Sequence, residues 1–131
     1  MEFFFMCQEL DWEAELAVVI GKKGKNIDVD KARDYIFGYT VAHDVSARDW
    51  QFGKNGGQWL LGKAMDGFCP LGPCIVTPDE IHDPHQLAIC CSVNGKLKQS
   101  SNTSQIVHNS YYCVSYLSKL MARFSFRSND W

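Results

Sequence analysis

Three acidic residues have the types and spacing of a site for a hard metal cation. Glu13 and Glu15 stand two residues apart at the start of an apolar, β-branched stretch that ends in Gly21. Since side chains alternate faces along a strand, the two glutamates point to the same side. A third acid, Asp44, follows a second strand-like segment. Carboxylates without a sulfur or imidazole ligand suit Mg²⁺, Mn²⁺ or Ca²⁺. The alternative is that water reaches this end of the strand and the acids are solvated.

Two neighbouring strands are needed to bring these acids together. Residues 11–21 predict a buried strand that runs out to a turn, and residues 39–45 predict a second strand, β-branched and aromatic. Ser46 is expected to cap a short helical turn over residues 47–51, with Asp49 imitating a capping box. If the two strands are neighbours, the three acids converge on one point, where their mutual repulsion calls for a cation.

The remaining segments predict short strands and turns with few helices. Asp28 or Asp30 could cap a short helix that Gly38 ends. Prolines 70 and 73 rule out a central strand there, and a short strand is expected over residues 74–76. These features predict an α+β domain dominated by β-structure.

Two features near the end of the chain are stronger signals. Asn94-Gly95 between two alternating segments predicts a hairpin that pairs residues 87–93 with 96–100. Beyond it, helical spacing predicts one apolar helix face. That face is formed by Tyr111, Val114, Tyr116, Leu117, Leu120 and Met121.

Composition bounds the class of protein. The chain has 131 residues, 46% hydrophobic and 21% charged, with a net charge of −2, which indicates neither nucleic acid nor an anionic membrane as a partner. No apolar run approaches the ~20 residues that span a bilayer, and residues 1–7 lack the basic region of a signal peptide. The six cysteines have no C-x-x-C spacing, and four lie in apolar segments typical of buried thiols. A reducing intracellular compartment, cytoplasmic or mitochondrial, is expected.

The motifs D-W-E-A-E-L-A-V-V-I-G, G-Y-T-V-A-H-D-V-S-A-R-D-W-Q, L-L-G-K and D-P-H-Q-L occur in this order. Together they resemble the fumarylacetoacetate hydrolase superfamily, from about residue 9 to about residue 121. The resemblance implies a β-rich mixed-sheet roll of the family's C-terminal-domain type. It also implies that residues 1–131 form a single partial catalytic domain, with a divergent tail over residues 122–131.

The same resemblance assigns roles to individual residues. Glu13, Glu15 and Asp44 match the family's ligands for Mg²⁺ or Mn²⁺. Lys63 matches a substrate-side, catalytic lysine, although by itself it would be interpreted as a surface residue. Gln51 matches a substrate-binding glutamine. Arg48 and Asp49 are expected to brace the loop.

The chemistry that the resemblance implies is hydrolysis of a C–C bond in a β-diketo acid, or decarboxylation of a β-keto acid such as oxaloacetate. Both reactions leave an enolate, which a divalent ion stabilises as a Lewis acid while Lys63 adds positive charge. The expected partners are a small oxo-acid substrate and, as in the family, a second copy of the chain in a homodimer.

Two family features are not found in the sequence. The upstream lid with its water-activating histidine and glutamate is missing, and so is the T-G-T-P loop that closes the site. None of the four histidines lies in such a motif, and His85 in the D-P-H turn is expected to be structural. An alternative is therefore a catalytically inactive, truncated family member that binds a cation or pairs with a full-length relative.

Overall fold

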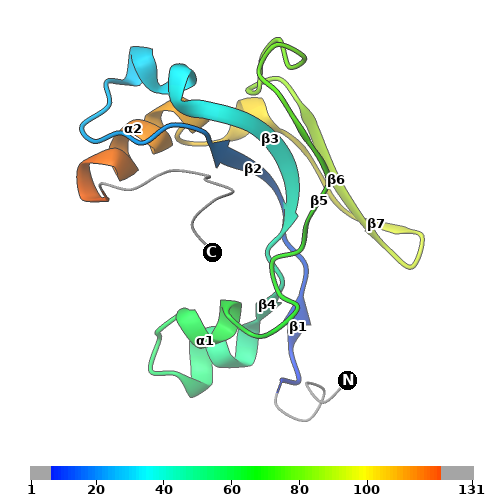
Figure 1. Ribbon diagram of the computed structural model, residues 1–131. Coiled ribbons are helices and arrows are strands. Elements are labelled where there is room, and N and C mark those ends of the chain that lie inside the picture. The colour runs from blue at the N-terminus through cyan, green and yellow to red at the C-terminus, as the bar shows by residue number, and fades with distance from the viewer. Residues whose placement is uncertain (1–6, 122–131) are drawn as a thin grey trace.

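The centre of the molecule is a curved three-stranded sheet, seen in a computed structural model that describes residues 7–121 (Figure 1). Its strands are β2 (Ala14–Ile20), β3 (Ile36–His43) and β5 (Leu71–Val76), in the order β2-β3-β5 with antiparallel neighbours. Pro73 lies in the edge strand β5 and Pro70 just before it, which confirms that these prolines exclude a central strand. The strand begins earlier than the expected residue 74.

Two smaller antiparallel pairs flank this sheet. β1 (Leu10–Asp11) pairs with β4 (Ser46–Ala47), and β6 (Ala88–Val93) pairs with β7 (Lys96–Asn102) in the predicted hairpin. Asn94 and Gly95 both have positive φ, 52° and 76°, as a tight two-residue hairpin turn requires. The hairpin prediction is confirmed.

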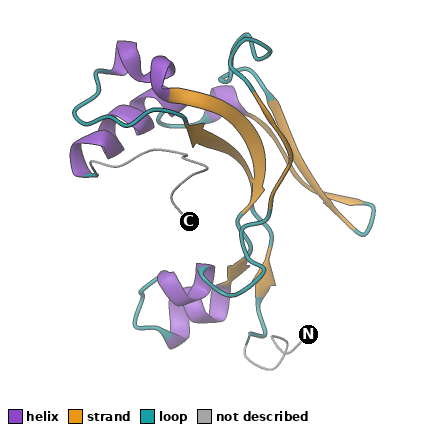
Figure 2. Ribbon diagram, viewed as in Figure 1, coloured by secondary structure: helices purple, strands orange, loops and turns teal. Residues whose placement is uncertain are grey.

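Helices gather near the two ends of the central sheet (Figure 2). A 3₁₀ helix, η2 (Val29–Tyr35), lies against α2 (Ser110–Leu120) at one end. At the other end, a π-helix, η3 (Asp49–Lys54), packs against the short α1 (Leu60–Lys63). A further 3₁₀ turn, η4 (Thr103–Gln105), follows β7. These elements confirm an α+β fold. No helix in the described part of the chain is long and apolar enough to cross a membrane.

The hydrophobic core lies between β2, β3, η2 and α2. Its buried members are Ile27, Ala32, Ile36, Tyr39 and Val114, and Leu16, Val18 and Ile20 of β2 pack against them. The even-numbered residues of β2 therefore face the core, which leaves the other face of the strand for the glutamates.

The expected helix end at Gly38 is wrong, because this glycine lies inside β3. A Cβ at this position would meet Val76 O at 2.6 Å and Ile75 Cγ2 at 2.5 Å. The glycine therefore permits the close approach of β5 to β3, and it does not end a helix.

The expected cap at Ser46 is also wrong. Ser46 is buried in β4, where it pairs with Asp11 and donates its hydroxyl to the Asp44 carbonyl oxygen at 3.0 Å. The following helix begins at Asp49, whose carboxylate accepts from Lys54 Nζ and Cys7 Sγ. The Ser46 hydroxyl bonds a backbone carbonyl and the Asp49 carboxylate bonds two other side chains, so no capping box forms.

The helix predicted near the end of the chain is present, but much of its packed face is polar. Ser115 and Ser118 are buried and bond the backbone of Ile27: Ser115 Oγ donates to the carbonyl at 2.7 Å, and Ser118 Oγ accepts from the amide at 2.9 Å. Small hydroxyl residues allow the helix to approach this loop closely. The prediction fails for Tyr116, Leu117, Leu120 and Met121, which are exposed.

The cysteines differ from expectation as well. All six thiols are free, but only Cys7 is buried. Four lie on short or edge strands or at helix surfaces with one side open to water, so apolar neighbours in sequence did not imply burial. Residues 122–131, expected to be a divergent tail, lie outside the described residues.

Candidate metal centre

The register of β2 and β3 brings the three predicted acids to one place. Asp44 N donates to Glu13 O at 2.8 Å, so these two residues lie opposite each other just beyond the paired strands. Glu15 lies opposite Ala42, whose small side chain leaves room beside it. The geometric prediction that the acids converge is confirmed: one carboxylate oxygen from each lies within 4.8 Å of the other two. We call Glu13, Glu15 and Asp44 the acid cluster.

The spacing of the acid cluster fits one hard cation. Metal–oxygen distances of about 2.0–2.6 Å allow ligands on opposite sides of an ion to lie up to about 4–5 Å apart. The carboxylate oxygens of the acid cluster, which lie within 4.8 Å of one another, meet this limit. Within residues 7–121, this is the one group of three or more acidic, histidine or cysteine side chains that meets this criterion. The donor set is all oxygen, which excludes the sulfur-rich sites typical of structural zinc.

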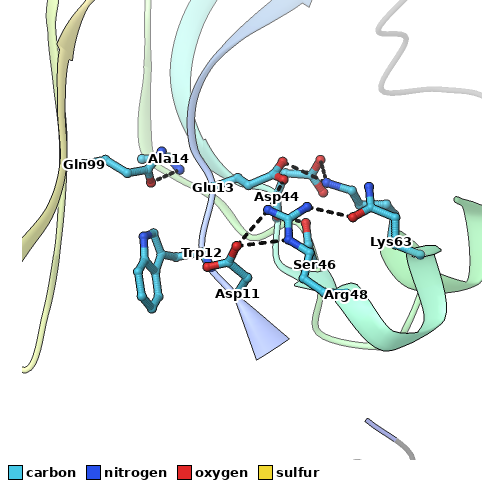
Figure 3. Close-up of polar contacts among 10 residues, drawn as sticks. Asp11, Trp12, Glu13, Ala14, Asp44, Ser46, Arg48, Lys63 and Gln99 are labelled. Atoms are coloured by element: carbon cyan, nitrogen blue, oxygen red, sulfur yellow. Dashed lines mark hydrogen bonds and ion pairs between the residues drawn. The ribbon is translucent and has the colours of Figure 1, made fainter. Parts of the chain in front are cut away.

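Lys63 ends α1 and points its ammonium group into the acid cluster (Figure 3). Nζ lies 2.8 Å from Glu13 Oε2 and 2.7 Å from Asp44 Oδ2. Burial alone would lower the pKa of Lys63, but hydrogen bonds and charges of Asp44 and Glu13 outweigh it and raise the pKa. Lys63 is therefore charged at neutral pH and lies beside the acid cluster, while its catalytic and substrate-binding roles stay predictions.

Arg48 occupies the other side of Glu13 (Figure 3). Its guanidinium group binds Glu13 Oε1 at 2.7 Å, Asp11 Oδ2 at 2.9 and 3.0 Å, and Gln51 Oε1 at 2.7 Å. Sequence reasoning expected Arg48 to brace a loop but missed Asp11 altogether. The D-W-E motif could have indicated this contact, because Asp11 and Glu13 are two residues apart and so point to the same side of an extended segment.

Gln51 lies beneath this arginine. Its side chain is 1% exposed, and its amide oxygen accepts from Arg48. A substrate contact by Gln51 stays a prediction, and it would require this side chain to be uncovered. In the described structure, Gln51 fixes the orientation of Arg48.

The two glutamates have opposite electrostatic environments. Burial would raise the pKa of Glu13, but hydrogen bonds from Lys63 and Arg48 prevail and lower it. The pKa of Glu15 is raised, first by desolvation and then by repulsion from Asp44 and Glu13. Of the two glutamates, Glu15 is thus the one whose negative charge is disfavoured.

The formal charges of the site leave an excess of two negative charges. Four carboxylates, from Asp11 and the acid cluster, face the two cations Arg48 and Lys63. A divalent cation would bring this sum to zero. The site therefore fits a divalent cation in charge as well as in spacing.

The hairpin β6–β7 fixes the start of β2. Gln99 Oε1 accepts from Ala14 N at 2.8 Å (Figure 3). Lys98 Nζ lies 5.0 Å from the ring centroid of Trp12. A cleft of about 570 Å³ lies between β2, β7 and α2, and Glu15 is the one residue of the acid cluster among its lining. Because the cleft runs mainly along the apolar face of β2, we assign the candidate site to the acid cluster and not to the cleft.

Two histidines, His85 and His43, are engaged elsewhere or face away from the acid cluster. His85 Nε2 lies 2.8 Å from Ser110 Oγ, and its ring packs edge-on against Tyr111, which fixes the start of α2. This contact fits the structural role expected for His85. His43 lies opposite Ala14 in the ladder, so its side chain takes the other face of the sheet from Glu15.

Gly62 permits the contact that positions Lys63. A Cβ on Gly62 would lie 2.9 Å from Gln51 Cβ and 3.0 Å from both Gln51 Cα and N. These contacts are shorter than side chains tolerate, so α1 can pack on η3 only with a glycine here.

Replacing Gly62 by alanine should therefore cost about 1–3 kcal/mol of unfolding free energy, the usual penalty of overpacking. Urea denaturation measures it. Gly53→Ala is the matched control, because a Cβ at Gly53 meets nothing within 4 Å and its φ is not positive. The control should keep the stability of the original chain; equal stability in both variants would contradict the packing argument.

The family is shown by sequence and by structure. The family model described as fumarylacetoacetate (FAA) hydrolase C-terminal matches residues 4–130. The chain is similar to the mitochondrial oxaloacetate tautomerase fahd2 of Xenopus laevis, with 63% identity over 114 residues, which are 87% of this chain and 36% of that protein. It thus spans little more than a third of the length of such curated relatives.

Solved structures agree. Fumarylacetoacetate hydrolase from Exiguobacterium antarcticum superimposes with a TM-score of 0.86 and 38% identity, over 92% of this chain and 43% of that one. The 5-carboxymethyl-2-hydroxymuconate delta-isomerase from Mycobacterium smegmatis gives a TM-score of 0.82 and 40% identity, over 88% and 44%. The chain belongs to the fumarylacetoacetate hydrolase C-terminal domain family.

Proposed function

We propose that this chain is the cation-binding part of an enzyme that interconverts the keto and enol forms of a small 2-oxo acid, with oxaloacetate as the first candidate. The observation that carries the proposal is the convergence of the acid cluster with the Lys63 ammonium group. The name of the Xenopus laevis relative, an oxaloacetate tautomerase 63% identical to this chain, supports the choice of reaction.

Each residue of the site has a role in this proposal. Glu13, Glu15 and Asp44 hold the cation, which is Mg²⁺ or Mn²⁺ by preference, with Ca²⁺ as a further candidate for an all-oxygen site. When bound, the cation supplies Lewis-acid polarisation of adjacent substrate oxygens. Lys63 offers positive charge where negative charge develops on the oxo acid. Arg48 keeps Glu13 oriented toward the site.

The second candidate is cleavage of a C–C bond, by hydrolysis of an acylpyruvate or decarboxylation of oxaloacetate. It shares the need to stabilise an enolate, so the same residues serve it. The similarity to the Exiguobacterium antarcticum fumarylacetoacetate hydrolase, at 38% identity, favours this candidate. A chain that binds the cation without any turnover, alone or paired with a longer relative, is the alternative from another class.

Three assays on the purified chain separate these functions. The loss of enol absorbance of oxaloacetate reports tautomerisation, pyruvate release reports decarboxylation, and the loss of acylpyruvate absorbance reports hydrolysis. Each is run with Mn²⁺, with Mg²⁺ and after chelation. We expect metal-dependent tautomerisation to exceed the other two rates. Pyruvate release or acylpyruvate loss as the faster reaction would replace the first candidate by the second.

The proposed compartment follows the same relatives. Several are named as mitochondrial, and we propose that compartment for the protein. We also propose a homodimer, which sedimentation of the purified chain tests directly: a monomer at micromolar concentration would contradict it.

A further inference from the structure

The ammonium group of Lys63 contacts two of the three members of the acid cluster. It bonds Glu13 Oε2 and Asp44 Oδ2, two carboxylate oxygens of the acid cluster. Arg48 engages the remaining oxygen of Glu13, Oε1, at 2.7 Å. Both oxygens of Glu13 are therefore paired with positively charged side chains.

The two cationic side chains differ in how firmly they are held. Arg48 has three partners, Asp11, Glu13 and Gln51, and the last of these is buried. Lys63 Nζ is ion-paired with two residues, Glu13 and Asp44, and its flexible side chain extends from the last residue of the four-residue α1. Lys63 can move its charge at small cost, whereas moving Arg48 would break several bonds.

From this arrangement we infer that Lys63 is a resident counter-charge that competes with the divalent cation, and that metal entry releases its ammonium group toward the substrate. This inference rests on the proposed function of the acid cluster. A metal ion held by the same carboxylates would repel the Lys63 ammonium group, because both cations bind the oxygens of Glu13 and Asp44. Lys63 thus weakens metal binding, stabilises the metal-free site, and becomes available to a 2-oxo acid only after the cation is in place.

The test is the affinity for Mn²⁺, measured by electron paramagnetic resonance of the free ion and by calorimetry, without substrate. Lys63→Met keeps the length of the side chain and removes its charge, and it should bind Mn²⁺ about tenfold more tightly, a conservative share of the Coulomb energy between close charges. Lys96→Met is the matched control: Lys96 is the exposed first residue of β7, next to the Asn94-Gly95 turn, and solvent screens its charge. This control should keep the original affinity.

A second pair of variants keeps the experiment decisive. Lys63→Arg retains the charge and should retain the weaker affinity, while Glu15→Gln should lose binding in any background. Unchanged or weaker binding by Lys63→Met, with binding still lost in Glu15→Gln, overturns the competition but leaves the metal site intact. Absence of binding in every variant, or normal binding in Glu15→Gln, overturns the proposed metal site and the inference with it. Circular dichroism confirms that each variant is folded.

Discussion

Replacing Arg48 by methionine should cost about 2–4 kcal/mol of unfolding free energy, the range expected when one partner of a partly buried charge network is removed. Its guanidinium group joins Asp11, Glu13 and Gln51, which come from three elements or their borders. Side-chain exposure of 26% for Arg48 and 25% for Glu13 limits solvent compensation. The variant would leave two carboxylates and a buried amide oxygen without their shared donor.

Urea denaturation at neutral pH measures this loss. Lys31→Met is the control, since its pair with Asp30 is 4.0 Å long and both side chains are mostly exposed. Such pairs contribute about 0–1 kcal/mol. Equal midpoints for the two variants would show that the arginine network contributes no more than a surface pair.

The acid cluster could be predicted because its determinants are local. Strand periodicity places Glu13 and Glu15 on one face, and the Asp44 segment is the next β-branched stretch along the chain. Adjacent strands usually pair, and here the antiparallel ladder sets Glu13 opposite Asp44. The hairpin at Asn94-Gly95 was predictable for the same reason, because two residues determine the turn.

Contacts between distant segments could not be read from periodicity. The bond between Arg48 and Asp11 joins residues 37 positions apart and depends on the pairing of β1 with β4. The Gly62 contact depends on a π-helix, which sequence pattern does not distinguish from an ordinary helical turn. α2 buries serines because they meet backbone groups of Ile27, and this preference outweighs the apolar pattern of its other face.

Glu15→Gln should have opposite effects on the metal-free and the metal-bound protein. In the metal-free protein the pKa of Glu15 is raised, by desolvation and by repulsion from Asp44 and Glu13. A raised folded-state pKa favours stability below the ordinary value of 4.5, and that stability is lost as pH rises through the folded value. At pH 7, the neutral glutamine should therefore raise the melting temperature slightly. Below about pH 4, where the glutamate is protonated, the two proteins should melt alike.

With the cation present, the same substitution should be harmful. Mn²⁺ or Mg²⁺ binds the folded state and should raise the melting temperature of the original chain, but not that of Glu15→Gln. Metal-dependent tautomerisation should fall by about 10²–10³-fold, the loss typical when one group that stabilises developing charge is removed. Glu9→Gln is the control, because Glu9 is an exposed glutamate outside the acid cluster. Metal-induced stabilisation that survives in Glu15→Gln would show that the ion binds elsewhere. A fall in metal-free stability would show that Glu15 is favourably charged in the folded protein, contrary to the repulsion described here.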